Sequence, residues 1–346
     1  MPVGDATKIV ELGAGYTPLH KCDMLADAIG LRTLYVKDDT VNPTCSFKDR
    51  PATVAISKAL EFGAKAVGCA STGNLAAATA AHAAKAGLPC YVFVPKGIEL
   101  NKIVQATIYG ATVIAVRGTY DDANRLAAQA AEFYDLALVN INIRPYYVEG
   151  SKTLAFETCE QLNWEPPDHV VVPMASGALI CATCKGLDEL LKVGLIEGSR
   201  IRVTGAQPQG CSPIVAAFKS GGEDVEPIEN PNTMAKSLAI GDPGDGFYSI
   251  RRIRESGGVA ESASDAEVLD AIKLLARTEG IFAEPAGGVT IAVLKKLVES
   301  GEIRRDEEVV CFVTGNGLKA TEAILGSMPK PIEIEPTLES LKALTI

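Results

Sequence analysis

Aromatic side chains are scarce in this 346-residue chain, at 5% of all residues, although apolar residues make up 47%. The core must therefore consist mainly of Ala, Val, Ile and Leu, which is typical of buried parallel strands covered by Ala-rich helices. No apolar run approaches the roughly 20 residues that a membrane-spanning helix needs. The first residues, MPVGDATKIVELGAGY, also lack the basic and then apolar pattern of a signal peptide. We therefore expect a cytoplasmic protein with no membrane partner.

An excess of positive charge is also missing, since the formal net charge is −10. This balance argues against nucleic acid and anionic membranes as partners. The three histidines are scattered, and the one C-x-x-C pair, Cys181 and Cys184, has no second pair at zinc-ribbon spacing. Nine cysteines in a chain of this length indicate reduced thiols. We expect no metal site and favour core packing for this pair over zinc or redox chemistry, which stay as alternatives.

Short β-branched runs alternate with longer Ala-rich runs along the whole chain. Strands are predicted at 31–39, 64–71, 89–95, 111–118, 136–142, 168–175, 199–207 and 307–315. Helices are predicted at 51–63, 74–87, 99–109, 121–134, 177–193, 213–220, 265–279 and 287–299. Such βαβ repetition predicts an α/β fold with mostly parallel sheets. The length suggests two domains with a boundary near 145–150, a loop at 221–247, and an extended tail that ends in a short helix.

Ligands of open parallel sheets gather beyond the carboxyl ends of the strands. One segment at such a place is NPTCSFKDRP, in which Lys48 stands just before a predicted helix. A lysine there is most often a plain surface charge. It is also the side chain that forms a Schiff base with a carbonyl cofactor once burial lowers its pKa.

Three further strand ends carry small polar residues. Ser71-Thr72-Gly73-Asn74 opens a helix and suits either an anion or simple N-capping by Thr72 or Asn74. The loop at 175–179 could cradle a phosphate with its N–H groups, although small-residue loops are common at such junctions. Thr314 ends the last strand, where its hydroxyl could meet a ring nitrogen or a backbone group.

In combination and in this order, these segments resemble the fold-type II pyridoxal phosphate enzymes, the tryptophan synthase β family. SFKDR around Lys48, STGN at 71–74, EGSKTLAFE at 149–157 and TGNGLK at 314–319 are most similar to the threonine synthases within that family. The resemblance covers about residues 15–325. It implies a carbon–oxygen lyase that acts on a phosphate ester and needs pyridoxal 5'-phosphate.

The resemblance also implies roles for individual residues. Lys48 would carry the cofactor and later move protons at Cα and Cβ of the substrate, Asn74 would hydrogen-bond the phenolic oxygen, and Thr314 would face the pyridine nitrogen. Backbone N–H groups would hold the cofactor phosphate at Ala175, Ser176, Gly177, Ala178 and Leu179. The last two stand where many threonine synthases have glycine and asparagine, so the loop must keep its shape with different residues. The substrate carboxylate would be held by Ser71, Thr72 and Gly73.

The implied reaction converts O-phosphohomoserine and water to threonine and phosphate, so the substrate's own phosphate needs a second binding pocket. Candidates are Asn140, Asn142 and Arg144 in VNINIRPYY, and Lys152 nearby. Arginine suits bidentate phosphate binding. An ordinary loop arginine is the alternative.

The resemblance implies a smaller mobile domain at 45–148, which carries Lys48 and Asn74. It also implies a larger domain at 1–44 and 149–330 that binds the cofactor phosphate, a tail at 331–346, and a homodimer. Related chemistry of the cysteate synthase, cysteine synthase or serine/threonine dehydratase type stays open, as does a sensing module without turnover. A nicotinamide dehydrogenase is set aside, because no strand is followed by G-x-G-x-x-G with an acidic residue about 20 positions on.

Overall fold

Two helix-flanked sheets form the body of the chain in the computed structural model, which describes residues 2–197 and 201–344. In this part of the chain the larger sheet has six strands, in the order β1 (Leu19–Lys21), β2 (Thr33–Asp38), β10 (Glu308–Val313), β7 (His169–Pro173), β8 (Arg202–Pro208) and β9 (Ala260–Ala263). Neighbouring strands are parallel except for β1, which pairs antiparallel with β2 at the edge. The predicted α/β class is confirmed.

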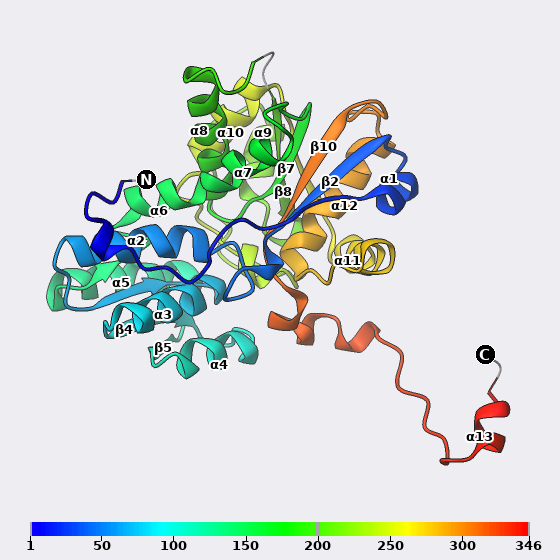
Figure 1. Cartoon of the computed structure of the whole chain (residues 1–346), viewed down its shortest axis with the longest axis horizontal. Coiled ribbons are helices and arrows are strands. Elements are labelled where there is room, and N and C mark those ends of the chain that lie inside the picture. The colour runs from blue at the N-terminus through cyan, green and yellow to red at the C-terminus, as the bar shows by residue number, and fades with distance from the viewer. Residues whose placement is uncertain (1, 198–200, 345–346) are drawn as a thin grey trace.

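The smaller sheet is parallel throughout, with the strand order β5 (Thr112–Val116), β4 (Cys90–Pro95), β3 (Val67–Ala70) and β6 (Ala137–Leu138). Its helices are α2 (Asp49–Glu61), α3 (Asn74–Ala86), α4 (Leu100–Ile108) and α5 (Tyr120–Tyr134). They gather around this sheet on one side of the molecule (Figure 1). Apolar side chains of α2, α3 and α4 pack on one face and those of α5 on the other.

Both faces of the larger sheet are covered by helices, and alternate residues of its strands explain how. Val170 and Val172 point to one core while Val171 points to the other, as the two-residue period of a strand requires. The helices of this part are α1 (Asp23–Ile29), α7 (Thr153–Gln161), α8 (Ala178–Lys192), α9 (Pro213–Lys219), α10 (Gly246–Ser256), α11 (Asp265–Glu279) and α12 (Pro285–Glu299). α6 (Arg144–Ser151) packs against α2, and its Tyr147 side chain belongs to the core of the smaller sheet. Side chains of α1, α11 and α12 belong to one core, and those of α7 to α10 to the other.

The predicted strand at 136–142 is mostly wrong, because β6 ends at Leu138. The Asn142 side chain explains the early end. Its Oδ1 accepts from the Leu138 N–H at 2.7 Å and its Nδ2 donates to the Leu136 carbonyl at 2.9 Å. These bonds turn the chain back where a longer strand would have continued.

Other elements went unpredicted, namely α1, β1, β9 and the helices α6, α7 and α10. The loop predicted at 221–247 has one short 3-10 turn at Lys236–Leu238 and gives way to α10 at Gly246. Residues 199 and 200 of the strand predicted at 199–207 lie outside the described residues.

The chain beyond Met328 leaves the body as an exposed segment that ends in α13 (Leu338–Lys342), drawn in red in Figure 1. Among the helices of the described residues, none is both long enough and apolar enough to cross a membrane.

Candidate active site

The site lies where the carboxyl ends of strands from both sheets meet. A cavity of about 360 Å³ is lined there by Lys48 at the start of α2, Ser71 and Thr72 after β3, and Ala175 and Ser176 after β7. A narrower hollow of about 60 Å³ adjoins it and adds Asn74, Gly177, Leu179, Glu284 and Thr314. The four segments singled out in the sequence therefore converge, as the ends of parallel strands predict.

Lys48 occupies the N-cap position of α2, and its amine points into the cavity. Nζ donates a hydrogen bond to the Tyr147 hydroxyl at 2.6 Å. Burial lowers the pKa of Lys48 to about 8, against the charge of Glu284, which raises it. More of this amine is therefore neutral near physiological pH than in an ordinary lysine, and the neutral form is the one that attacks a carbonyl group.

The sequence does not predict a role for Tyr147, although it lies in the RPYYVEGSK segment beside the candidate phosphate ligand Arg144. It is buried on α6, and burial raises the pKa of its phenol well above the usual value. The hydroxyl therefore stays protonated and serves as a fixed hydrogen-bonding group beside Lys48. A tyrosine in a short stretch of mixed polar and apolar residues gives no local sign of such a role.

The turn that opens α3 is organised by Ser71, whose Oγ accepts from the backbone N–H groups of Gly73 at 2.8 Å and Ala76 at 3.0 Å. This serine, and neither Thr72 nor Asn74, supplies the side-chain acceptor at the helix start. The Thr72 hydroxyl donates to the Ser237 carbonyl at 3.4 Å. Asn74 points into the narrow hollow, where its Nδ2 donates to Glu284 Oε1 at 2.5 Å.

The 175–179 loop turns into α8 at Gly177, which has a φ of 92°. A Cβ at this position would lie 2.1 Å from Ser249 Oγ, so only glycine fits the turn. Ala178 is the first residue of α8 and needs no left-handed backbone, while the Leu179 side chain packs in the core. The two departures from the threonine synthase pattern therefore leave the turn itself intact.

Thr314 follows β10 and is buried, and its carbonyl accepts from the Phe47 N–H at 2.9 Å. This bond ties the end of the last strand of the larger sheet to the segment that presents Lys48. It brings Thr314 to the same narrow hollow as Lys48 and Asn74.

The candidate phosphate ligands separate in the structure. Asn140 and Arg144 line the cavity, and Arg144 is paired with Asp245. Asn142 is exposed and uses its side chain on the backbone of the β6 turn. Lys152 does not line the cavity, because its amine lies 2.5 Å from Glu149 and 2.6 Å from Glu189.

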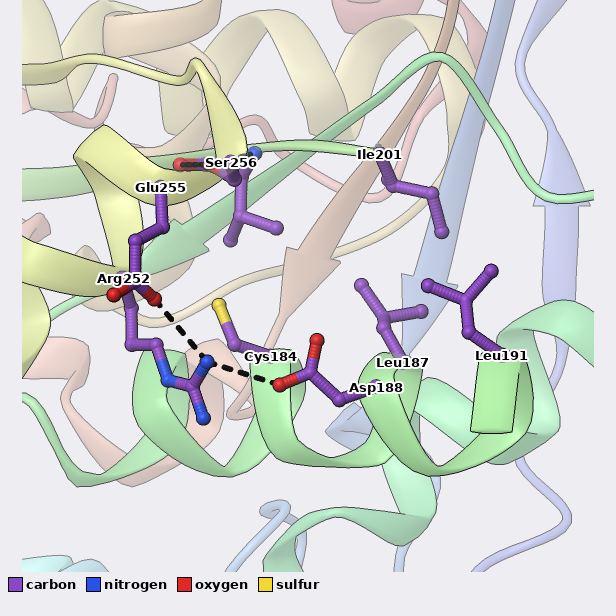
Figure 2. A pocket seen from close by; sticks show the side chains of 9 residues that line it. Cys184, Leu187, Asp188, Leu191, Ile201, Arg252, Glu255 and Ser256 are labelled. Atoms are coloured by element: carbon purple, nitrogen blue, oxygen red, sulfur yellow. Dashed lines mark hydrogen bonds and ion pairs between the residues drawn. The ribbon is translucent and has the colours of Figure 1, made fainter. Parts of the chain in front are cut away.

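A second hollow, of about 60 Å³, lies between α8 and α10 and includes Cys184 of the C-x-x-C pair (Figure 2). Its arginine, Arg252, is 2.9 Å from Asp188 and 3.3 Å from Glu255. Burial raises the pKa of Cys184 to about 12, so the thiol stays protonated. This environment agrees with core packing for the cysteine.

Comparison with known proteins shows which family this chain resembles in sequence. A family model described as "Pyridoxal-phosphate dependent enzyme" matches residues 10–315. The threonine synthase of Methanocaldococcus jannaschii is 46% identical over 99% of this chain and 85% of the relative. That of Mycobacterium tuberculosis is 40% identical over 97% of this chain and 91% of the relative. The chain belongs to the pyridoxal-phosphate dependent enzymes, in the threonine synthase family.

Solved structures of pyridoxal-phosphate dependent enzymes share the fold. Diaminopropionate ammonia lyase from Escherichia coli superposes with a TM-score of 0.78 at 20% identity, over 94% of this chain and 92% of that one. Maize serine racemase gives 0.73 at 22%, over 87% and 88%. The predicted fold-type II architecture and its cofactor are confirmed.

The residues present fit the cofactor of this family. Within the described residues, Asn74 Oδ1 is a buried atom that meets no hydrogen-bond partner, and it belongs to a side chain that lines the narrow hollow. The start of α8 offers backbone N–H groups that favour a phosphate. The amine of Lys48, the amide of Asn74 and the hydroxyl of Thr314 thus surround one space.

Proposed function

We propose that this chain converts O-phosphohomoserine and water to L-threonine and phosphate, with pyridoxal phosphate held on Lys48. The main support for this activity is the pairing of a reactive amine and a cation in one cavity. The Lys48 amine, with a pKa lowered to about 8, shares a cavity of about 360 Å³ with Arg144. A base for the substrate's carbon skeleton and a cation for its phosphate are the two groups that this reaction needs from the protein.

Lys48 is the proposed base at Cα and the proton carrier at Cβ. When bound, pyridoxal phosphate supplies the electron sink for this chemistry. A pKa near the working pH lets one amine both take up and return a proton. The Tyr147 hydroxyl, 2.6 Å away, limits the positions that Nζ can adopt.

The remaining cofactor contacts are proposed for the narrow hollow. Asn74 would meet the phenolic oxygen and Thr314 the pyridine nitrogen, since both side chains line that space. The phosphate of the cofactor would lie at the start of α8, on the N–H groups of residues 175–179. A neutral threonine hydroxyl does not stabilise a pyridinium as a carboxylate would.

The substrate would lie across the wider cavity. Ser71, Thr72 and Gly73, at the start of α3, would receive its carboxylate. Arg144 would bind its phosphate, with Asp245 holding the guanidinium in place before substrate arrives. For Asn142 and Lys152 we propose supporting roles, in the β6 turn and in the ion pairs beside α8, where their contacts lie.

Water must reach Cβ while bulk solvent stays out, and we propose that domain closure achieves this. The moving unit would be residues 45–148 against 1–44 and 149–330, with 331–346 as a tail. The support is topological, because β3 to β6 form one sheet and β1, β2 and β7 to β10 form the other.

We also propose a cytoplasmic homodimer. Nine free cysteines suit a reducing compartment. A second copy would cover the apolar side chains that the C-terminal segment exposes, which are Ile332, Ile334, Leu338 and Leu341. Light scattering that gave the mass of one chain at micromolar concentration would contradict the dimer.

The test of the activity is phosphate release from O-phosphohomoserine by cofactor-loaded protein, with threonine measured in parallel. We expect both products in equal amounts, and neither from Lys48→Ala. Cofactor binding without threonine formation would leave the assigned fold and the role of Lys48 standing, but it would contradict O-phosphohomoserine as the substrate. Activated serine substrates, as used by cysteine or cysteate synthases, would then be tested.

A further inference from the structure

A buried row of charged and polar groups runs from the narrow hollow into α4. Glu284, at the N-cap of α12, is 1% exposed, and its Oε1 accepts from Asn74 Nδ2 at 2.5 Å. Its Oε2 lies 3.4 Å from Lys102 Nζ on α4, which is also 1% exposed. Lys102 Nζ lies 3.3 Å from Glu99 Oε2 at the helix start. The row therefore joins α3 and α4 of the smaller sheet to α12 of the larger part.

Two motif glycines make room for this row. A Cβ on Gly73 would lie 2.3 Å from Lys102 Cδ, and a Cβ on Gly315 would lie 2.3 Å from Glu284 Oε1. The Glu284 N–H also donates to the Gly315 carbonyl at 2.9 Å. Glycines in the STGN and TGNG segments thus serve a buried ion pair as well as any ligand.

The hydrogen bonds of this buried row are incomplete. Among the described residues, Asn74 Oδ1 is buried and meets no hydrogen-bond partner, whereas Glu284 Oε2 and Lys102 Nζ have only the ion pairs at 3.4 Å and 3.3 Å. Unpaired buried polar atoms are costly, and they are retained where a ligand or a function needs them. Since Asn74 and Glu284 both line the narrow hollow, the cofactor ring is the ligand that they would meet.

We propose that Glu284 is a positioning residue whose carboxylate holds the Asn74 amide toward the cofactor ring, with Lys102 as its counter-charge. An amide carries two N–H groups and a carbonyl oxygen, so one N–H bonds Glu284 while the second N–H and the unpartnered Oδ1 stay available to the phenolic group. Lys102 lies on α4, so the ring side of the site is complete only while this lysine reaches Glu284 at the start of α12. The inference rests on the proposed contact between Asn74 and the cofactor.

The test compares Glu284→Gln, Lys102→Met and the double variant, with Glu99→Gln as the matched control. Glu99 also faces Lys102 but does not touch Asn74. The readouts are the cofactor dissociation constant, from titration of cofactor-free protein, and the visible absorption band of the bound cofactor. We expect Glu284→Gln and Lys102→Met each to weaken cofactor binding about tenfold and to shift the band, because the carboxylate that holds the Asn74 amide loses its charge or its counter-charge. The double variant should lose less than the product of the two singles.

Unchanged affinity and an unchanged band in Glu284→Gln would overturn the inference, as would an equal effect of Glu99→Gln. If Glu284→Gln does not fold, Glu284→Asp keeps the charge but withdraws it from Asn74, and the same shift is expected. Measurements on the wild type distinguish a failure of this inference from a failure of the proposed activity. A normal band without threonine formation rejects only the substrate, whereas a wild type without the band rejects the Lys48 assignment.

Discussion

At Lys48, one hydroxyl and two aromatic rings surround the amine. Nζ lies 2.6 Å from the Tyr147 oxygen, 4.4 Å from the centre of the Phe47 ring and 5.3 Å from that of Tyr147. Burial keeps water away from the amine, which disfavours its charged form and lowers the pKa. Reactivity at this position thus depends on its sequence neighbour Phe47 and on Tyr147, which lies 99 residues away in the chain.

Tyr147→Phe removes the hydroxyl and keeps the ring. We expect the cofactor to bind still, and kcat to fall about tenfold, because one hydrogen bond to a reactive amine is lost. The loss should appear in kcat more than in KM. Tyr146→Phe is the matched control, since the Tyr146 ring packs against Phe62 instead. Equal kcat in the two variants would contradict the role of Tyr147.

At the scale of elements, the start of α8 shows how one residue shapes a binding turn. Gly177 takes a left-handed backbone and lies directly against Ser249 of α10. The helix start is thereby fixed both by its own glycine and by a neighbouring helix. Ala178 and Leu179 follow in ordinary helical conformation, which is why their side chains can vary.

Gly177→Ala should weaken cofactor binding at least tenfold and lower the free energy of unfolding by more than about 1 kcal/mol. The positive φ accounts for the stability cost in part, and the clash with Ser249 Oγ adds to it. Titration with cofactor and denaturant unfolding measure the two effects. Ala178→Gly is the control, and it should keep cofactor affinity within about twofold while costing roughly 0.5–1 kcal/mol of stability. A Gly177→Ala protein with normal affinity would show that the turn tolerates a side chain.

At the scale of the whole molecule, a buried charge network joins the N-terminal segment, α2 and α7. Arg50 Nε lies 2.7 Å from Asp39 and its Nη1 lies 2.6 Å from Glu157. Lys37, in β2, lies 2.9 Å from the same glutamate. Burial opposes ionisation of Glu157, but hydrogen bonding and charge from Arg50, together with Lys37, lower its pKa to about 2. The helix that presents Lys48 is thereby anchored to the larger sheet.

Arg50→Leu should cost about 3–5 kcal/mol of unfolding free energy, because two carboxylates lose their buried partner. Arg125→Leu, which breaks an exposed pair with Asp122, should cost less than about 1 kcal/mol. The folded pKa of Glu157 lies below its usual value of 4.5, so its stabilisation is full above that pH and is lost as pH falls toward 2. This acid-dependent decline should shrink in Arg50→Leu. Denaturant unfolding between pH 7 and pH 2 checks both points, and equal losses in the two variants would contradict the network.

The sequence by itself determined the α/β class, most strands and helices, and the segments that form the site. Runs such as VVVP and Ala-rich stretches have local periods, and motif residues such as Lys48 and Asn74 are marked by their neighbours in the chain. Only the tertiary structure decided which distant side chains meet them. Asn74 bonds Glu284, 210 residues away, and Lys48 bonds Tyr147, 99 residues away. Such contacts depend on how elements pack, and local propensity holds no information about them.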